Sequence, residues 1–389
     1  MRDAILACNA GSSTIKFALY HTGQPEPALL ARGLIDHDHE PAHVRVETST
    51  GEYLLDDTLP ITDLAEQFHW ITEWLTTSFR DVKLVGAGHR VVHGGEHFIA
   101  PVLVDDDVMK QLTALNQLAP LHQPHNLAAI AAFATAIPGL PQVACFDTAF
   151  HHSNPLLTTL YALPQELTKT GIRRYGFHGL SYDYITGQLP SVAGSLPQRV
   201  VVAHLGSGAS LCALHKGRSI ASSMGFSALD GIPMATRSGN LDPGVLLYLM
   251  CERGMDYNAL SKLLYHQSGL LGLSGISGDM RVLESSTDAS ARQAIDLFVY
   301  RISREIGSLV AALGGLDALV FTGGIGEHSA SLRTAVCEQA AWLGVDIDKN
   351  ANQKNTVKLH SVNSRIAVYV IPTNENQVIA RATQTIIGN

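Results

Sequence analysis

Near its start the chain reads Asn9-Ala10-Gly11-Ser12-Ser13-Thr14-Ile15-Lys16, and near its middle it reads His204-Leu205-Gly206-Ser207-Gly208-Ala209-Ser210. Each stretch follows one apolar run and leads into another, which predicts a strand, a Gly/Ser-rich turn and a returning strand. Small residues in a tight turn leave backbone N–H groups uncovered, and such groups form a concavity that binds anions. A single turn of this kind usually only connects two strands. Two of them after matched strands favour a duplicated fold that holds nucleotide phosphates between its halves.

The composition describes a globular protein with more than one core. A chain of 389 residues exceeds the usual size of a single domain, and 46% of its residues are apolar. The net charge of −8 and the lack of a long Lys/Arg run argue against nucleic acid as a partner. No apolar stretch is long enough to cross a bilayer, and we expect no signal peptide and no membrane partner. Five scattered cysteines without a C-x-x-C pair predict buried, reduced thiols in a cytoplasmic protein.

Strand-like and helical patterns alternate along the chain, which predicts an α/β fold. The expected strands cover 4–8, 17–20, 43–47, 83–91, 142–146, 199–203, 318–322 and 366–371. The expected helices cover 64–79, 108–118, 126–135, 242–252, 257–265, 289–312, 331–343 and 376–387. The order of elements restarts at residue 199, after a boundary near His151–Pro155. We therefore predict one domain of residues 1–150 joined by a C-terminal helix at 376–389, and a second domain of residues 151–375.

Polar residues at the ends of buried strands are the first candidates for chemistry, because open α/β sheets bind ligands there. Arg90 lies among glycines at 88–95, Asp147 ends a buried strand, His178 lies between glycines, and Arg237 stands in a loop. Residues 322–327 read Thr-Gly-Gly-Ile-Gly-Glu, a Gly-rich turn before a helix of the kind that cradles a nucleotide. Taken singly, such an arginine is more often solvated and such a histidine more often belongs to the core.

Several other kinds of site are disfavoured. Eighteen histidines invite a zinc interpretation, with His122/His125 or His151/His152 as candidates, but no H-E-x-x-H or Cys/His spacing supports it. The P-loop signature G-x-x-x-x-G-K-[ST] is missing, and no G-x-G-x-x-G follows the first strand. The chain is therefore neither a P-loop enzyme nor a dinucleotide-binding protein of the usual type.

Taken together, the motifs of the whole chain resemble those of the acetate kinases in order and spacing. They are NAGSSTIKF, GHRVVHGG, LAPLH, FDTAFH, YGFHGLS, HLGSGAS, GIPMATRSG, FTGGIGE and PTNEN. The resemblance implies an α/β fold of duplicated actin/hexokinase/Hsp70-like (ribonuclease H-like) domains with an active-site cleft between them. It implies a homodimer that phosphorylates acetate with ATP and Mg²⁺, or Mn²⁺ in its place, by reversible, direct in-line transfer to acetyl phosphate. The first domain is expected to take the substrate and phosphate, and the second to bind the nucleotide.

The resemblance also assigns catalytic roles. Arg90 and Arg237 would grip carboxylate or phosphoryl oxygens, since a guanidinium can bind them in a bidentate manner. His178 would donate a hydrogen bond to the transferring group as charge develops. Asp147 is too acidic to act as a base toward an acetate that is already ionised, so we assign it to orientation and the metal environment.

Binding roles follow from the same resemblance. The substrate would contact Arg90 and an apolar wall for its methyl group, formed by Val92, Leu121 and Phe177. Asn9 and Glu375 would form the Mg²⁺ side, because magnesium takes few protein oxygens and keeps several waters. The nucleotide and its phosphates would contact Ser12, Lys16, His204, Gly206, Ser207, Gly208, Asp279, Met280, Arg281, Gly323, Gly324, Ile325 and Gly326.

The chain departs from the usual family pattern at a few positions. Ser207 replaces an asparagine, and Ala235 and Asn240 stand in the arginine loop where glycine and aspartate are usual. His328 and Asn376 follow the two motif glutamates in place of asparagine and glutamate. None of these changes removes an arginine, the histidine or the metal carboxylate. The predicted activity therefore stands, and the preferred nucleotide base is left open.

Three alternatives remain. A propionate kinase of the same family fits the small Ala228, where some relatives carry a proline, because it leaves room for a longer acid. A non-catalytic, actin-like ATP-binding protein would need the two turns but not Arg90, Arg237 and His178 together. A sugar kinase would need a carboxylate base and polar sugar ligands, which the apolar methyl wall disfavours.

Overall fold

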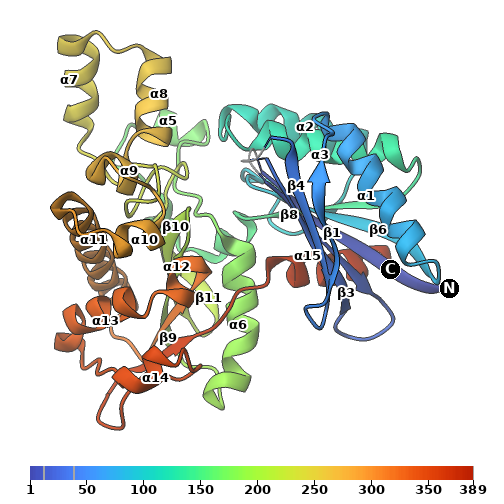
Figure 1. The fold of residues 1–389 in the computed structure, drawn as a ribbon. Helices are drawn as coiled ribbons and strands as arrows, with labels where there is room; N and C mark the ends of the chain where they lie inside the picture. Colours follow the sequence, from blue (N-terminus) through green and yellow to red (C-terminus); the bar gives the residue numbers. More distant parts are fainter. Residues whose placement is uncertain (12–13, 38–39, 389) are drawn as a thin grey trace. The chain divides into compact units, whose positions relative to one another are not determined.

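The computed structural model describes residues 1–11, 14–37 and 40–388, which form two compact units (Figure 1). Unit 1 comprises Met1–Phe150 and Asn374–Asn389, and unit 2 comprises His151–Thr373. The returning segment of unit 1 begins two residues before the expected 376. The reason is that Asn374 caps the last helix by accepting from the Gln377 N–H at 3.1 Å and receives the Tyr20 hydroxyl at 3.3 Å.

Unit 1 is built on a mixed sheet of strand order β5-β4-β3-β2-β1-β6-β8-β7. Its strands are β1 (Arg2–Ala10), β2 (Thr14–His21), β3 (Ala28–Asp36), β4 (Ala42–Thr48), β5 (Tyr53–Leu59), β6 (Val82–Val91), β7 (Val102–Leu103) and β8 (Gln142–Phe146). β1 pairs antiparallel with β2, which confirms the first predicted hairpin, and it runs parallel to β6, which is in turn parallel to β8. Sequence patterning missed β3 and β5, and β5 in particular exposes five of its seven residues.

The helices of unit 1 lie on both faces of this sheet. They are α1 (Leu64–Ser78), α2 (Asp106–Ala114), α3 (Gln123–Ala136) and α15 (Glu375–Ile387), and a 3-10 turn (Leu115–Gln117) follows α2. A Cβ on Gly88 of β6 would lie 2.5 Å from Ile379 of α15, so the missing side chain lets this helix pack directly on the strand. Successive side chains of a strand point to opposite faces, and His89 accordingly meets Phe133 of α3 at 5.4 Å between ring centroids. Arg90 is thereby directed to the α15 face.

Unit 2 repeats the topology of unit 1. Its sheet has the order β11-β10-β9-β12-β13, with β9 (Arg199–Leu205), β10 (Ala209–His215), β11 (Arg218–Ser222), β12 (Ala318–Thr322) and β13 (Ala367–Val370). β11, β10 and β9 are antiparallel neighbours, whereas β9, β12 and β13 are parallel. The directions and order match β3-β2-β1-β6-β8 of unit 1. This match confirms the duplication predicted from the two hairpins.

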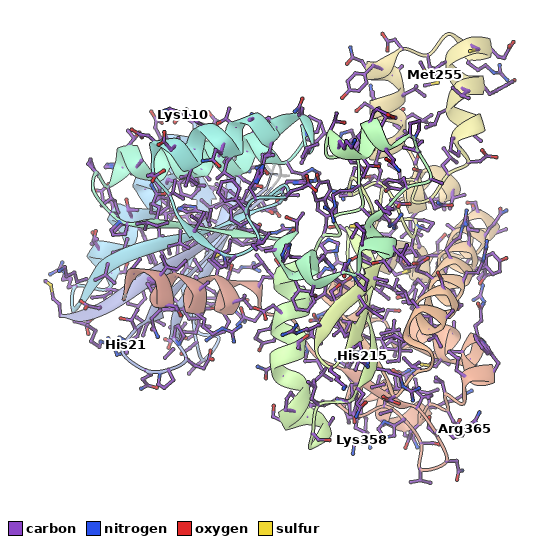
Figure 2. The ribbon with its side chains drawn as sticks, turned by 180° about the vertical axis from the view of Figure 1, so that it is seen from behind. His21, Lys110, His215, Met255, Lys358 and Arg365 are labelled. Atoms are coloured by element: carbon purple, nitrogen blue, oxygen red, sulfur yellow. The ribbon has the colours of Figure 1, made fainter. Side chains whose placement is uncertain are left out.

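The helices of unit 2 include a long, well-packed one and an exposed pair. They are α4 (Leu156–Thr159), α5 (Gln165–Lys169), α6 (Gly179–Ala193), α7 (Pro243–Arg253), α8 (Tyr257–His266), α9 (Gly269–Ser274), α10 (Met280–Ser285), α11 (Ala289–Leu313), α12 (Gly323–His328), α13 (Ala330–Gln339) and α14 (Lys349–Gln353). α11 buries eight residues, whereas α7 and α8 bury none. Figure 2 marks Met255 at the turn that joins α7 and α8.

Four sequence-based expectations need correction. Helix α6 was not predicted at all. Residues 323–328 are a short helix and not a turn, because the Glu327 carboxylate reaches back to the Gly323 N–H at 2.9 Å and caps the helix start. α13 ends at Gln339, and the remainder of the expected helix is a 3-10 turn at Ala341–Leu343. Cys251 is exposed on α7, while the other four cysteines are buried as expected.

Within the described residues, no helix combines the length and apolarity that a membrane span requires.

Candidate active site

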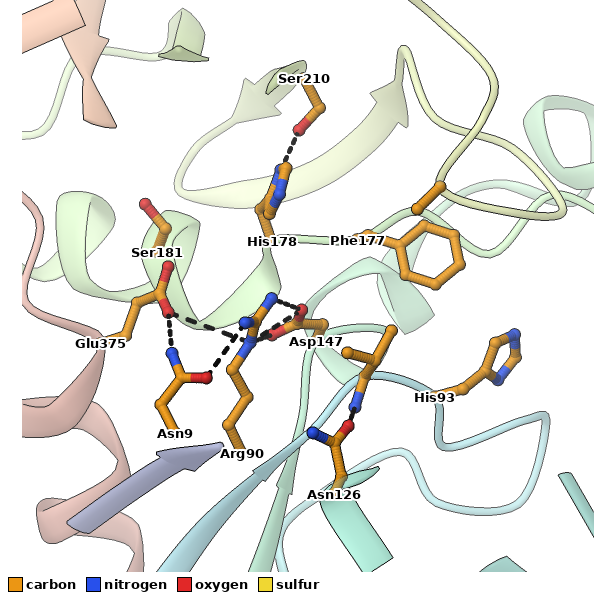
Figure 3. Close-up of polar contacts among 12 residues, drawn as sticks. Asn9, Arg90, His93, Asn126, Asp147, Phe177, His178, Ser181, Ser210 and Glu375 are labelled. Carbon is orange, nitrogen blue, oxygen red and sulfur yellow. Dashed lines mark hydrogen bonds and ion pairs between the residues drawn. The ribbon is translucent and has the colours of Figure 1, made fainter. Parts of the chain in front are cut away.

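In unit 1, polar side chains gather at the carboxyl ends of three parallel strands. Asn9 lies at the end of β1, Arg90 at the end of β6, and Asp147 directly after β8. Glu375, the first residue of α15, completes the group (Figure 3). Because parallel strands end at the same edge of a sheet, residues that are far apart in sequence meet here.

Arg90 is at the centre of this cluster. Its Nη2 lies 2.5 Å and its Nε 3.0 Å from the Asp147 carboxylate, an arrangement in which both nitrogens donate to one carboxylate. Its Nη1 donates to Asn9 Oδ1 at 3.2 Å, and Glu375 Oε2 lies 3.9 Å from Nε. Burial pushes the pKa of Arg90 down, but the charges of Asp147 and Glu375 outweigh burial and raise it above its usual range. The guanidinium is therefore permanently charged and held in one orientation.

The cluster carries two carboxylates against one guanidinium. Asp147 is almost fully buried, with 1% of its side chain exposed, whereas Glu375 keeps 17% and faces solvent in part. Asn9 Nδ2 donates to Glu375 Oε2 at 3.3 Å, which places the Asn9 amide beside that carboxylate. Oxygen donors of this kind suit Mg²⁺, which takes one or two carboxylates and retains several waters. Among the residues described, no group of three or more His, Cys, Asp or Glu could hold a metal.

Asn126 is a buried residue beside this cluster that the sequence analysis missed. Its Oδ1 accepts the Val92 N–H at 3.0 Å, and its Nδ2 donates to the Ala10 carbonyl at 2.8 Å. One buried side chain of α3 thus ties the end of β6 to the end of β1 and fixes the backbone of Val92. A polar residue within the long apolar run of α3 was the signal that could have revealed it.

The remaining predicted residues of unit 1 lie nearby or outside the described part. Lys16 is the cross-strand partner of Asn9, so both side chains are on the same face of the sheet. Val92 is buried, and Leu121 is half-buried in the turn before α3. Ser12 lies outside the described residues.

In unit 2, His178 and Arg237 converge on the second Gly-rich turn. A Cβ on Gly208 would lie 3.2 Å from His178 Nε2 and 3.8 Å from Arg237 Nη1. The glycine therefore leaves open a space onto which two nitrogen donors are directed. Ser207 of the same turn accepts the Ala235 N–H at 3.1 Å, which attaches the arginine loop to the hairpin.

His178 has an unusual backbone conformation. Its φ of 58° and ψ of 25° are left-handed, and among the described residues only two other non-glycine positions share a positive φ. A non-glycine residue in this region costs about 1–3 kcal/mol, and such residues cluster at functional sites. The preceding carbonyl, that of Phe177, accepts from His151 Nε2 at 2.9 Å, and Phe177 itself is buried.

Around the His178 ring the side chains are packed and bonded. His178 Nδ1 is 2.8 Å from Ser210 Oγ (Figure 3). The His204 ring stacks on His178 with centroids 4.4 Å apart, and its Nδ1 is 2.8 Å from Ser181 Oγ. The Tyr182 hydroxyl is in turn 2.5 Å from Ser210 Oγ. Ser181 and Ser210 close the motifs YGFHGLS and HLGSGAS, but neither they nor Tyr182 were assigned a role from the sequence.

The predicted nucleotide turns are brought together at the ends of β9 and β12. A Cβ on Gly206 would lie 3.9 Å from the Gly324 nitrogen and from His204 Nε2. Gly324 is exposed, whereas Gly323 and Gly326 are buried and Ile325 is half-buried. Arg333, which has no exposed surface, donates to the carbonyls of Gly326 and Glu327 at 2.9 and 2.8 Å and so holds the end of α12.

The segment 279–281 forms the start of α10. Asp279 caps α10 through the Arg281 N–H at 2.9 Å and pairs with the Arg281 guanidinium at 2.6 Å, while Met280 is buried in the core. The preceding Gly278 packs against Ala235, since a Cβ there would lie 2.8 Å from the Ala235 carbonyl. The segment therefore adjoins the arginine loop, and its nucleotide contacts stay a prediction.

Guanidinium and imidazole nitrogens beside a Gly-rich turn suit the negative charge of a transferring phosphoryl group, and with the duplicated sheets this arrangement fits a phosphotransferase. The chain belongs to the acetokinase family, whose family model matches residues 4–381. It is 54% identical over 388 residues to the acetate kinase of Rhodopseudomonas palustris, with 98% of each chain covered. Membership in this family makes the chain a kinase with a carboxyl acceptor, in a family that uses ATP.

Solved structures agree with the sequence match. A propionate kinase from Francisella tularensis is 37% identical, with a TM-score of 0.92 and coverage of 98% of this chain and 99% of that one. The acetate kinase of Porphyromonas gingivalis is 34% identical, with a TM-score of 0.86 and 99% of both chains covered. The predicted family and fold class are therefore confirmed.

Proposed function

We propose that the chain transfers the γ-phosphoryl group of ATP to acetate in one reversible, in-line step. A carboxylate oxygen of acetate attacks the γ-phosphorus, the bond to the β–γ bridging oxygen breaks, and ADP leaves. The observation that carries this proposal is the convergence of His178 Nε2 and Arg237 Nη1 over Gly208. Two donors fixed around such a space would stabilise the charge that spreads over the equatorial oxygens of the transferring group.

In unit 1, Arg90 would bind the substrate and Asp147 would orient Arg90. The two nitrogens already bonded to Asp147 leave Nη1 as the nitrogen that donates to Asn9. If a carboxylate or phosphoryl oxygen of the substrate replaced the neutral Asn9 amide as the acceptor of Arg90 Nη1, the hydrogen bond would become stronger. Hydrogen bonds between two charged groups are about twice as strong as those between neutral groups. Asp147 needs no proton-transfer role, since acetate is ionised at neutral pH.

Asn9 and Glu375 would hold Mg²⁺ through one carboxylate and one amide oxygen. Bound there, the ion would neutralise charge on the ATP phosphates, and Mn²⁺, which also accepts oxygen ligands, would substitute. Ser12, Lys16, His204, Gly206, Ser207, Gly208, Asp279–Arg281 and Gly323–Gly326 would contact the nucleotide and its phosphates.

The acid itself is a choice between acetate and propionate. Val92, Leu121 and Phe177 would face the substrate methyl group. Ala228 lies beside Arg237, because its carbonyl accepts from Arg237 Nη1 at 3.4 Å. Its small side chain favours some tolerance of a longer acid. A relative at 37% identity is a propionate kinase, which supports propionate as the second candidate substrate.

We also propose a homodimer formed through the exposed α7–α8 hairpin. α7 and α8 bury no residue within the chain, yet they expose apolar side chains including Leu247, Tyr248 and Met250. An exposed apolar surface of this kind is typical of a protein interface. Sedimentation equilibrium should show a dimer for the wild type and a monomer for Leu247→Glu, and a wild-type monomer would refute the proposal.

A cytoplasmic location is proposed because all five cysteines are free thiols.

The test is an acyl hydroxamate assay with ATP, Mg²⁺, hydroxylamine and a series of short acids. Product with acetate, with or without propionate, is expected. ATP consumption with a sugar but without hydroxamate would indicate a sugar kinase, and ATP binding without turnover would indicate a non-catalytic member of the fold. Either result would contradict the proposed function.

A further inference from the structure

We propose that Ser210 and Tyr182 hold His178 as the neutral tautomer that carries its proton on Nε2. The proposal rests on the proposed role of His178 as a hydrogen-bond donor to the transferring phosphoryl group. It assigns to Ser210 and Tyr182 a positioning role that lies entirely within unit 2.

The His178 ring has one nitrogen directed inward and one directed at the turn. Nδ1 is 2.8 Å from Ser210 Oγ, and Ser210 Oγ is in turn 2.5 Å from the Tyr182 hydroxyl. Ser210 and Tyr182 have no exposed surface. Nε2 is the ring atom nearest to the side-chain-free position of Gly208, at 3.2 Å from where a Cβ would lie. The proton on Nε2 is therefore the one that a ligand over the turn would meet.

The direction of the hydrogen bonds decides where that proton is. Ser210 has one hydroxyl hydrogen, so it can donate either to His178 Nδ1 or to Tyr182, but not to both. The phenol is the more acidic hydroxyl and hence the better donor, so Tyr182 donates to Ser210 and Ser210 donates to Nδ1. An accepting Nδ1 places the proton of a neutral imidazole on Nε2. If instead His178 Nδ1–H donated to Ser210, Nε2 of the neutral ring would carry no proton and could only accept a hydrogen bond. Its lone pair would then face the lone pairs of the phosphoryl oxygens, which is repulsive.

The surrounding structure prevents the ring from adapting. His178 immediately precedes α6, and the Tyr182 N–H donates to its carbonyl at 3.1 Å, so both residues belong to the same first turn. His204 stacks on one face of the ring, and Ser181 holds His204 in place through its Nδ1. The left-handed backbone of His178 adds a further constraint. A wrong tautomer could not be corrected by a simple ring flip.

The direct test is NMR of the imidazole nitrogens in protein labelled with ¹⁵N-histidine, with His178→Asn used to assign the signal. In the wild type, Nε2 should be protonated and Nδ1 unprotonated. In Tyr182→Phe, which removes the hydroxyl but keeps the ring, the Nδ1-protonated form should appear. The kcat should fall in proportion to the lost fraction of the Nε2-protonated form, by up to about tenfold, since one neutral hydrogen bond biases such an equilibrium by about that factor. KM for acetate and ATP should change less than about twofold, because neither hydroxyl touches a substrate.

Tyr175→Phe is the matched control, since it removes a tyrosine hydroxyl of the same segment that donates to the Gly171 carbonyl at 2.8 Å. It should leave both the tautomer and kcat unchanged. Should Tyr182→Phe fold poorly, Ser210→Ala removes the donor to Nδ1 and should give the same two effects. A wild-type ring protonated on Nδ1, or a tautomer and kcat unaffected in these variants, would overturn the proposal. Full activity of His178→Asn would instead refute the proposed catalytic role and leave the tautomer result to stand by itself.

Discussion

Replacing His89 by leucine should remove a large part of the acid sensitivity of unit 1. His89 lies on β6 between Cys8 and Ala144, is 1% exposed, and packs edge-on against Phe133. Neither ring nitrogen makes a hydrogen bond of normal geometry within the described residues. Burial lowers its pKa from 6.5 to about 4, and a weak interaction with Gln142 offsets only part of this effect.

The sign and size of the effect follow from proton linkage. A base whose folded-state pKa is depressed binds its proton in the unfolded chain first, so stability is constant above about pH 6.5 and falls as the pH drops toward 4. A shift from 6.5 to about 4 corresponds to about 3 kcal/mol in total. About 2 kcal/mol of this is lost between pH 7 and pH 5. His93, whose pKa burial also lowers to about 4, contributes a similar loss that the variant retains.

The assay is urea unfolding at pH 7 and pH 5, followed by tryptophan fluorescence. In a Trp342→Phe background, the remaining tryptophans are Trp70 and Trp74 of α1, so the signal reports unit 1. Between pH 7 and pH 5, the free energy of unfolding of His89→Leu should fall by about 2 kcal/mol less than that of the parent. His97→Leu, at an exposed histidine of the same unit, is the control. A difference below about 0.5 kcal/mol between the parent and His89→Leu would show that the buried ring is not held neutral.

Three further predictions concern the proposed chemistry. Alanine in place of Arg90 or Arg237 should cost on the order of 3 kcal/mol or more in kcat, with lysine restoring only part of it; near-normal kcat would contradict the assignment. Val92→Ala should lower KM for propionate and shift the kcat/KM ratio by an amount within about 1–3 kcal/mol per methylene; an unchanged acetate-to-propionate ratio would remove Val92 from the pocket. Chelation of Mg²⁺ should abolish hydroxamate formation, and Glu375→Ala should require far more Mg²⁺ for half-maximal rate; an unchanged Mg²⁺ requirement would rule out Glu375 as a ligand.

The parts of the structure that could be predicted from the sequence are those with local causes. The Gly/Ser turns at 9–16 and 204–210 follow apolar strands, and both are hairpins between antiparallel neighbours. Helix starts were placed to within a few residues where a side chain caps them, as Asp242 does for α7 and Asp288 does for α11. The restart of the strand pattern was visible for the same reason, because alternating apolar runs determine strands locally.

The parts that could not be predicted depend on side-chain contacts that are made only in the folded chain. Asn126 bonds to Val92 and Ala10, and Arg333 bonds to Asn352 and to the end of α12, through contacts that only the folded topology creates. The short helix at 323–328 was missed because its glycines predict a turn. Its cap comes from Glu327, a residue inside the segment whose side chain turns back on the first residue. Local propensity carries no trace of such a contact.

The duplicated topology also explains why the two units carry different kinds of functional group. β1, β6 and β8 of unit 1 occupy the same positions in their sheet as β9, β12 and β13 in unit 2. In unit 1 the strand ends carry Asn9, Arg90 and Asp147, so charge is provided by side chains. In unit 2 the ends of β9 and β12 lead into glycine-containing segments at Gly206 and Gly323, and His178 and Arg237 approach the neighbouring Gly208 from other segments. The two copies of a common frame thus carry different groups at the same strand ends, because the residues that follow the strands, and not the strands themselves, determine what each sheet edge can bind.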